Sequence, residues 1–219
     1  MATEAPKSTT TTKRTLGVLI FDELAVMDAF GPLQYFHFFS NEIEVVLVAK
    51  TTGLKWTLPN EAGVPLHAPF DFETCPQLDI FLLPGGGGSR ALFKDPAHQE
   101  FILRQAKTAE YLLSVCTGSS FLAACGLLDG KRATTNKFAF HAIKASCGTE
   151  YDIEWVSHAR WVVDGNIWTS SGVTAGMDMT NAFLEHLFGA ERVHRISEII
   201  EYSPATDASQ DPFAYLVKE

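Results

Sequence analysis

The feature that most constrains the fold is a short apolar run, residues 111–115, which leads directly into Cys116, Thr117 and Gly118. The run is typical of a buried strand, and residues 119–126 follow a helical pattern. A strand that passes into a helix through a corner of small residues has the outline of a nucleophile elbow, which presents one side chain on a strained turn. The sequence therefore predicts that Cys116 stands at such a corner.

The electrostatics of this corner predict a reactive thiol. The partial positive charge at a helix N-terminus favours a thiolate, so we expect the pKa of Cys116 to be depressed. The alternative is that Cys116 is one more small buried residue, as free cysteines commonly are. The order of strand, cysteine, Thr-Gly and helix favours the reactive interpretation. Cys75, Cys125 and Cys147 lack this context, and we interpret them as structural.

A run of four glycines, residues 85–88, marks a second informative loop after the predicted strand 78–83. Glycine loses much backbone entropy on folding, so such a run indicates that the main chain approaches something closely. We expect Gly85 and Gly86 to offer backbone N–H groups to an anion or a polarised substrate. No Gly-Lys-Ser/Thr follows, which excludes a Walker-type phosphate loop. A flexible turn remains the alternative interpretation.

Strand-like and helix-like segments alternate along the chain. The predicted strands are residues 15–21, 43–49, 78–83, 111–115, 132–135, 151–155, 159–163 and 166–170, with a hairpin excursion over 55–67. The predicted helices are residues 33–39, 91–107, 119–126, 136–146, 177–188 and 190–202. This alternation predicts an α/β fold, a doubly wound and mostly parallel sheet between helices with a small antiparallel excursion. We expect residues 1–13 to be a disordered polar tail and residues 14–219 to form a single domain.

Several chemically informative residues follow predicted strands. These are Asp28, Gly85 with Gly86, Cys116 with Thr117, and Gly172 with Val173. Ligands of doubly wound sheets bind beyond the carboxyl ends of the strands. We therefore expect these residues to meet in one pocket around the cysteine.

The charge balance limits the classes of partner. The chain carries 17 Lys and Arg against 26 Asp and Glu, a net charge of −9, which provides no basic face for nucleic acid or an anionic membrane. No apolar run reaches the roughly 18 residues of a membrane span, and the first residues lack the apolar core of a signal peptide. The four cysteines lack metal-ligand or redox-pair spacing. We expect a cytoplasmic protein that binds a small-molecule substrate and uses no metal and no cofactor.

Several segments together resemble the ThiJ/PfpI superfamily, the amidotransferase-like group with a cysteine elbow. The matching segments are residues 26–32 (VMDAFGP), 83–86 (LPGG), 114–118 (SVCTG), 124–135 (ACGLLDGKRATT), 171–178 (SGVTAGMD) and 201–204 (EYSP). The resemblance covers nearly the whole chain. Asp28 before Gly-Pro, together with Cys-Thr-Gly, is similar to the isonitrile hydratase group within the superfamily. The resemblance implies a flavodoxin-like fold and a homodimer.

The resemblance also implies a role for each matching residue. Cys116 would be the nucleophile, Asp28 its acid/base partner, and the Thr117 hydroxyl part of the same site. The amides of Gly85, Gly86 and Thr117 would line a donor pocket, and the turn at Val173 would pack beside the cysteine. The implied reaction is the cofactor-free hydration of an isonitrile to an N-substituted formamide.

Two other functions of the superfamily are alternatives. One is a cofactor-free glyoxalase or deglycase, in which Cys116 attacks an aldehyde. The other is a non-enzymatic redox sensor or chaperone, in which an exposed low-pKa thiolate is oxidised. Peptidase- and glyoxalase-type relatives typically carry a His after the nucleophile or a Glu near the first strand, whereas this chain has Thr117 and Asp28. Asn136 and Lys137 stand where the hydratase group carries a His.

Overall fold

The computed structural model describes residues 13–217, so the predicted tail lies almost entirely outside the described residues. Within them, a six-stranded sheet has the order β2 (Ile43–Val48), β1 (Arg14–Leu19), β5 (Ile80–Leu83), β6 (Tyr111–Ser114), β10 (Ile167–Ser170) and β9 (Trp161–Asp164). All neighbouring strands are parallel except β9, which pairs antiparallel with β10. The predicted α/β fold class is confirmed.

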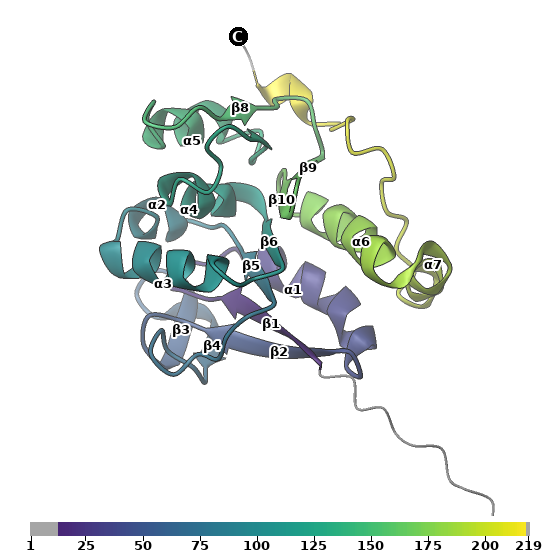
Figure 1. The fold of residues 1–219 in the computed structure, drawn as a ribbon, viewed down its shortest axis with the longest axis horizontal. Helices are drawn as coiled ribbons and strands as arrows, with labels where there is room; N and C mark the ends of the chain where they lie inside the picture. Colours follow the sequence, from purple (N-terminus) through teal and green to yellow (C-terminus); the bar gives the residue numbers. More distant parts are fainter. Residues whose placement is uncertain (1–12, 218–219) are drawn as a thin grey trace, which may run out of the picture.

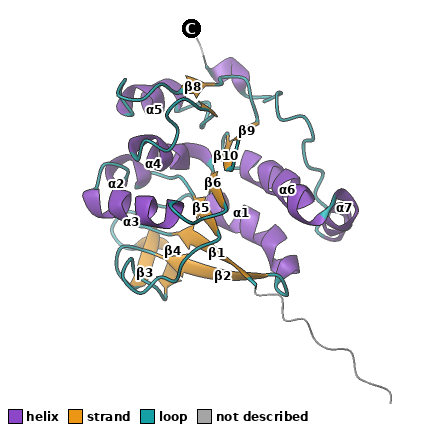
Figure 2. Cartoon of the chain, viewed as in Figure 1, coloured by secondary structure: helices purple, strands orange, loops and turns teal. Residues whose placement is uncertain are grey.

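Helices cover both faces of this sheet (Figures 1 and 2). On one face lie α1 (Val26–Phe36), α6 (Ala175–Phe188) and α7 (Ala190–Ile199), and on the other lie α2 (Ser89–Leu92), α3 (Pro96–Ala106) and α4 (Ser119–Ala124). The antiparallel excursion is the hairpin of β3 (Gly53–Leu58) and β4 (Ala62–Ala68). A parallel pair of short strands, β7 (Arg132–Ala133) and β8 (Glu154–Trp155), lies near α5 (Phe140–Ser146). The single-turn 3₁₀ helices are η1 (His37–Phe39), η2 (Cys116–Gly118) and η3 (Ala214–Leu216).

The core forms because the central strands are apolar on both sides. Every residue of β5 and of β10 is buried, as expected for parallel strands with helices on both faces. Between the sheet and the helices, the Phe183 ring of α6 makes edge or tilted contacts with Phe36, Tyr111 and Trp168. Such contacts add to the large apolar area that aromatic rings bury. This layer fixes the sheet on which the strand-end loops are mounted.

The single helix predicted over residues 91–107 is wrong, because the chain forms two helices there. The break falls at Asp95 and Pro96, where proline takes the first helical position of α3. Asp95 caps that helix by accepting a hydrogen bond from the His98 amide at 3.3 Å. A capping residue followed by proline is a start signal, so α3 begins afresh and α2 stays one turn long.

The start of the helix predicted over residues 33–39 is also wrong. The helix α1 begins at Val26, which places Asp28 in its first turn and Pro32 inside it. The interior place of Pro32 is unusual, because proline lacks the N–H that an interior helical position needs. The described chain has no helix long and apolar enough to cross a membrane.

We predict that Phe183→Ala lowers the free energy of unfolding by about 3–5 kcal/mol, because it leaves a cavity among aromatic rings. Phe183 has 0% of its surface exposed. Phe138→Ala is the matched control, since Phe138 is 84% exposed, and its effect should stay within about 0.5 kcal/mol. Urea denaturation of both variants measures the difference. Equal losses would contradict this account of the core.

Candidate active site

Cys116 stands at the predicted corner between a strand and a helix. Strand β6 ends at Ser114, η2 begins at Cys116, and the Cys116 backbone has φ of 59°. This left-handed conformation is uncommon for a residue with a side chain and persists only where the surroundings enforce it. Here the Cys116 amide donates to the Ser171 carbonyl at 2.9 Å. Two residues on, a Cβ on Gly118 would lie 1.9 Å from the Leu83 carbonyl oxygen, so only glycine lets the corner sit against β5.

The Asp28 carboxyl is the acidic group beside this corner. It has 0% exposure, and its Oδ2 accepts a hydrogen bond from the Gly85 amide at 2.9 Å. Its Oδ1 is buried without a hydrogen-bond partner in the described chain. Burial raises the pKa of Asp28 to about 6, and the Gly85 amide and the Cys116 thiol oppose that rise only in part. Asp28 can therefore gain or lose a proton near neutral pH.

The expected depressed pKa of Cys116 is wrong, because the structure raises it. Only 7% of the residue is exposed, and burial followed by the charge of Asp28 raises the pKa of the thiol to about 12. The Thr117 amide and the Asn136 side chain lower it by less. The helix after the corner, α4, has only six residues, so its contribution to a thiolate is small beside a buried carboxylate.

These two shifts describe a pair of acids that share one proton near neutral pH. With the pKa of the carboxyl near 6 and that of the thiol far above it, Asp28 is ionised and Cys116 is protonated. The thiol therefore needs an acceptor for its proton when the sulfur attacks an electrophile. Asp28 is placed to be that acceptor.

The glycine loop holds both the Asp28 carboxylate and the Thr117 hydroxyl in place. The Gly86 amide donates to Thr117 Oγ1 at 3.1 Å, and the Ser89 hydroxyl lies 2.9 Å from the same oxygen. A Cβ on Gly85 would lie 2.5 Å from Thr117 Oγ1 and 3.0 Å from Asp28 Oδ2, so the backbone comes as close as the sequence suggested. The amides of Gly85 and Gly86 thus position Asp28 and Thr117 and are already engaged.

Asn136 touches the sulfur, which the sequence interpretation missed. Its Nδ2 donates to Cys116 Sγ at 3.3 Å, and its Oδ1 accepts from the Ala139 amide at 3.0 Å. The bond from Ala139 fixes the orientation of the Asn136 side chain, because the backbone N–H needs the side-chain oxygen as its acceptor. The NH₂ group of Asn136 therefore points toward the sulfur. The helix predicted over residues 136–146 begins only at Phe140, which leaves Asn136 outside it. The signal was present, since Asn136 follows a predicted strand as the other site residues do.

The turn after β10 reaches Cys116 through its backbone. The Ser171 carbonyl binds the Cys116 amide, while the Val173 carbonyl accepts from the Gly176 amide at 3.2 Å. On the other side, the Thr135 hydroxyl donates to the Cys116 carbonyl at 3.0 Å. Loops after β1, β5, β6, β7 and β10 therefore meet at Cys116, as the strand-end rule predicts.

The described residues contain no group of three or more His, Cys, Asp or Glu side chains arranged to hold a metal ion. All four cysteines are free. Burial raises the pKa of Cys125 to about 12 and that of Cys75 and Cys147 to about 11. What distinguishes Cys116 is therefore its strained corner and its carboxylate neighbour, since a high pKa is common to all four.

The fold and the site define a class of protein: a doubly wound α/β protein with a cysteine at a nucleophile elbow and a buried carboxyl beside it. Residues 14–186 match the model of the DJ-1/PfpI family. The chain belongs to the DJ-1/PfpI family.

Named relatives and solved structures agree with this assignment. Isonitrile hydratase from Pseudomonas putida is 35% identical over 190 residues, which are 87% of this chain and 79% of that protein. Parkinson disease protein 7 homolog from Danio rerio is 29% identical over 168 residues, 69% of this chain and 86% of that protein. The crystal structure of a ThiJ/PfpI family protein from Pseudomonas syringae is 29% identical, with a TM-score of 0.75 over 94% of this chain and 83% of that one. The relatives thus include a named enzyme.

We predict that Asp28→Asn stabilises the protein at neutral pH. The pKa of Asp28 rises from 3.8 to about 6 on folding, so the folded state holds the proton more tightly. Stability from this group is complete below pH 4 and is lost as pH rises through 6, a loss of about 3 kcal/mol. Asparagine keeps the Gly85 hydrogen bond without the charge. The variant's advantage in urea denaturation should be absent at pH 4 and full at pH 7. An advantage that does not change with pH would contradict the raised pKa.

Proposed function

We propose that the chain is a cofactor-free hydratase that converts an isonitrile to an N-substituted formamide. The observation that carries the proposal is the buried pair of Asp28 and Cys116 at the elbow, in which a protonated thiol faces an ionised carboxylate. Hydration of an isonitrile requires a nucleophile and a proton at the same carbon, and this pair supplies both. The 35% identity to isonitrile hydratase from Pseudomonas putida also supports it.

The first half of the proposed reaction forms a covalent intermediate. Asp28 takes the proton of the Cys116 thiol while the sulfur bonds to the terminal isonitrile carbon, and Asp28 then delivers that proton to the same carbon. The product is a thioimidate, R–N=CH–S–Cys116, and Asp28 is again a carboxylate. Asn136 Nδ2 donates to the sulfur, which stabilises the negative charge that develops there. An amide cannot exchange a proton at this pH, so the acid/base work stays with Asp28.

The second half releases the formamide. Water adds to the thioimidate carbon as Asp28 takes one of its protons and passes it to the nitrogen. The resulting R–NH–CH(OH)–S–Cys116 loses its hydroxyl proton to the departing sulfur and becomes R–NH–CHO with the free thiol. One water is consumed, and the enzyme returns to its starting protonation. Splitting one difficult hydration into two steps is the usual gain of covalent catalysis.

The geometry gives less support to the two alternatives. A sensor cysteine needs an exposed thiolate, whereas Cys116 is 7% exposed with a raised pKa. A glyoxalase attacks a carbonyl and must stabilise an oxyanion, whereas the amides of Gly85 and Gly86 are engaged by Asp28 and Thr117.

The homodimer stays a prediction. Met27 and Phe30 on α1 are exposed and offer apolar surface that a second copy of the chain would cover.

One experiment with three reagents tests the proposal. The protein is mixed separately with cyclohexyl isonitrile, methylglyoxal and dilute peroxide, and small molecules and protein are followed by mass spectrometry. We expect the isonitrile to gain one water catalytically, while methylglyoxal is not consumed and Cys116 resists peroxide. Turnover of methylglyoxal without turnover of the isonitrile would replace the proposal with the glyoxalase. Rapid oxidation of Cys116 as the sole reaction would support the sensor.

We predict that Asp28→Asn separates turnover from thiol reactivity. Loss of general acid–base help should lower isonitrile turnover by roughly 10²–10⁴-fold. Alkylation of Cys116 by iodoacetamide at pH 8 should be at least as fast as in the wild type, because the charge of Asp28 raises the pKa of the thiol. Cys116→Ser should abolish both reactions, and Cys125→Ser serves as a control with normal turnover. Near wild-type turnover in Asp28→Asn would reduce Asp28 to a structural residue.

A further inference from the structure

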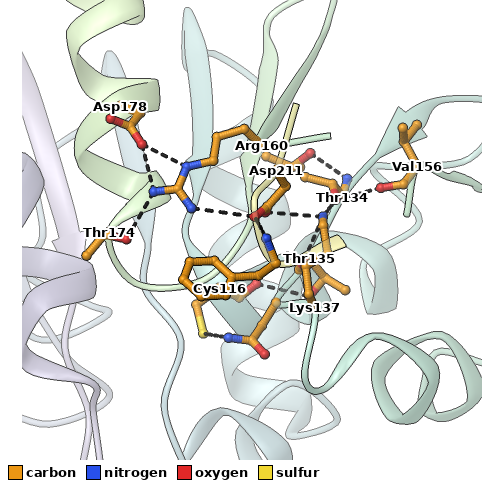
Figure 3. A network of polar contacts seen from close by, with 12 residues as sticks. Cys116, Thr134, Thr135, Lys137, Val156, Arg160, Thr174, Asp178 and Asp211 are labelled. Carbon is orange, nitrogen blue, oxygen red and sulfur yellow. Dashed lines mark hydrogen bonds and ion pairs between the residues drawn. The ribbon is translucent and has the colours of Figure 1, made fainter. Parts of the chain in front are cut away.

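Four charged side chains are buried together behind the turn that carries Asn136. Arg160 binds Asp178 Oδ2 through Nη2 at 2.8 Å, and its Nη1 lies 3.7 Å from Asp211 Oδ1. The Lys137 ammonium lies 3.9 Å from Asp211 Oδ2. Figure 3 shows the Asp211 carboxylate between the Arg160 guanidinium and the Lys137 ammonium. Two positive and two negative groups thus balance in a region with almost no solvent access.

Lys137 joins this cluster to the turn of residues 134–136. Its ammonium donates to Thr134 Oγ1 at 2.6 Å and to the Thr135 carbonyl at 3.4 Å. Thr134 Oγ1 in turn donates to the Val156 carbonyl at 2.8 Å. The next two side chains of the turn contact the nucleophile: the Thr135 hydroxyl reaches the Cys116 carbonyl, and Asn136 reaches the sulfur. The buried Lys137 ammonium therefore holds in place the turn of residues 134–136, from which Asn136 donates to Cys116.

Asp211 brings a distant part of the chain to this turn. The segment of residues 204–216 leaves the end of α7 and runs along the molecule past β9 toward β8 (Figure 1). It is fastened along its length, because the Ala205 amide donates to Asp178 Oδ1 at 2.9 Å and the Arg160 amide donates to the Ala208 carbonyl at 2.8 Å. The Asp211 amide donates to the His158 carbonyl at 2.9 Å. These contacts place the Asp211 carboxylate beside Lys137.

We propose that Lys137 and Asp211 are positioning residues for the active site: through them, the segment of residues 204–216 holds Asn136 against the Cys116 sulfur. The inference rests on Cys116 as the nucleophile of the proposed function, and it does not depend on the isonitrile as substrate.

The burial of Lys137 and Asp211 explains why these two residues act together. Lys137 is 2% exposed and Asp211 is 7% exposed, and a buried charge is costly unless an opposite charge accompanies it. Asp211 Oδ2 has no hydrogen-bond partner in the described chain. The positive charge that balances this oxygen is the Lys137 ammonium, 3.9 Å away. Burial lowers the pKa of Lys137 to about 8, although Asp211 opposes the change. Removal of the carboxylate would leave the ammonium without its opposite charge and free the turn.

The test measures how fast iodoacetamide alkylates Cys116 as a function of pH, in the full chain. Asn136→Ala removes the donor to the sulfur, and we expect its alkylation at pH 8 to fall by about tenfold, the effect of one lost charge-assisted hydrogen bond. Lys137→Met and Asp211→Asn should shift the profile in the same direction. In the double variant Asn136→Ala with Lys137→Met, the profile should equal that of Asn136→Ala alone, because the lysine acts through the asparagine.

Asp207→Asn is the matched control. Asp207 lies on the same segment and is exposed, and the only hydrogen bonds of its carboxylate within the described residues are with Ser209, so the profile of this variant should be that of the wild type. Where Lys137→Met yields no folded protein, Lys137→Met with Asp211→Leu removes both charges, and Asp211→Asn removes one charge at constant shape. Additive effects, or unchanged profiles in Lys137→Met and Asp211→Asn, would overturn the proposal. Because the readout is alkylation, failure of isonitrile turnover leaves this test intact.

Discussion

Two acids, the Asp28 carboxyl and the Cys116 thiol, are buried against each other, and both cannot be ionised there without a large penalty. Their protonation states are therefore coupled, and the pair titrates as a unit. The coupling explains why an elbow that looks suited to a thiolate instead raises the pKa of its cysteine. In the proposed hydration the carboxylate accepts the thiol proton as the sulfur attacks, so the pair favours a substrate that can use that same proton.

The rest of the fold holds Asp28 and Cys116 in their positions relative to each other. The central sheet brings the loops after β1, β5, β6 and β10 to one edge, where the loop after β7 of the β7–β8 pair joins them. Small residues let the backbones approach, as at Gly85 and Gly118. The site lowers the stability of the folded protein, since it buries the Asp28 carboxyl and holds the Cys116 backbone at a φ of 59°. The fully buried strands and the aromatic layer around Phe183 offset this cost elsewhere in the fold. The stability of the fold is thus drawn from a different part of the molecule than the candidate site.

Much of the fold could be predicted because buried parallel strands are continuous apolar runs, and the site because its residues follow those strands. Asp28, Cys116 and Thr117 do lie together with the glycine loop. The errors fall where local signals compete. Asp95 with Pro96 starts a new helix within a helical pattern. Asn136 was placed in a predicted helix that begins only at Phe140, and its side-chain amide faces the sulfur. The pKa of Cys116 was mispredicted because burial and a neighbouring charge are tertiary properties that a strand–helix pattern does not contain.

Pro32 lies inside α1. Because proline has no N–H, it cannot donate the helical hydrogen bond to the carbonyl of Asp28, four residues earlier. The helix ladder is therefore interrupted at the residue that carries the acid. Asp28 is held instead from its N-terminal side, where its amide donates to the Ala25 carbonyl and the Ala25 amide donates to Gly85. The start of α1 is fastened to the glycine loop twice, by the Ala25 amide and by the Asp28 carboxylate, which accepts from the Gly85 amide. The acid is thus anchored to the loop that orients it as well as to the helix that bears it.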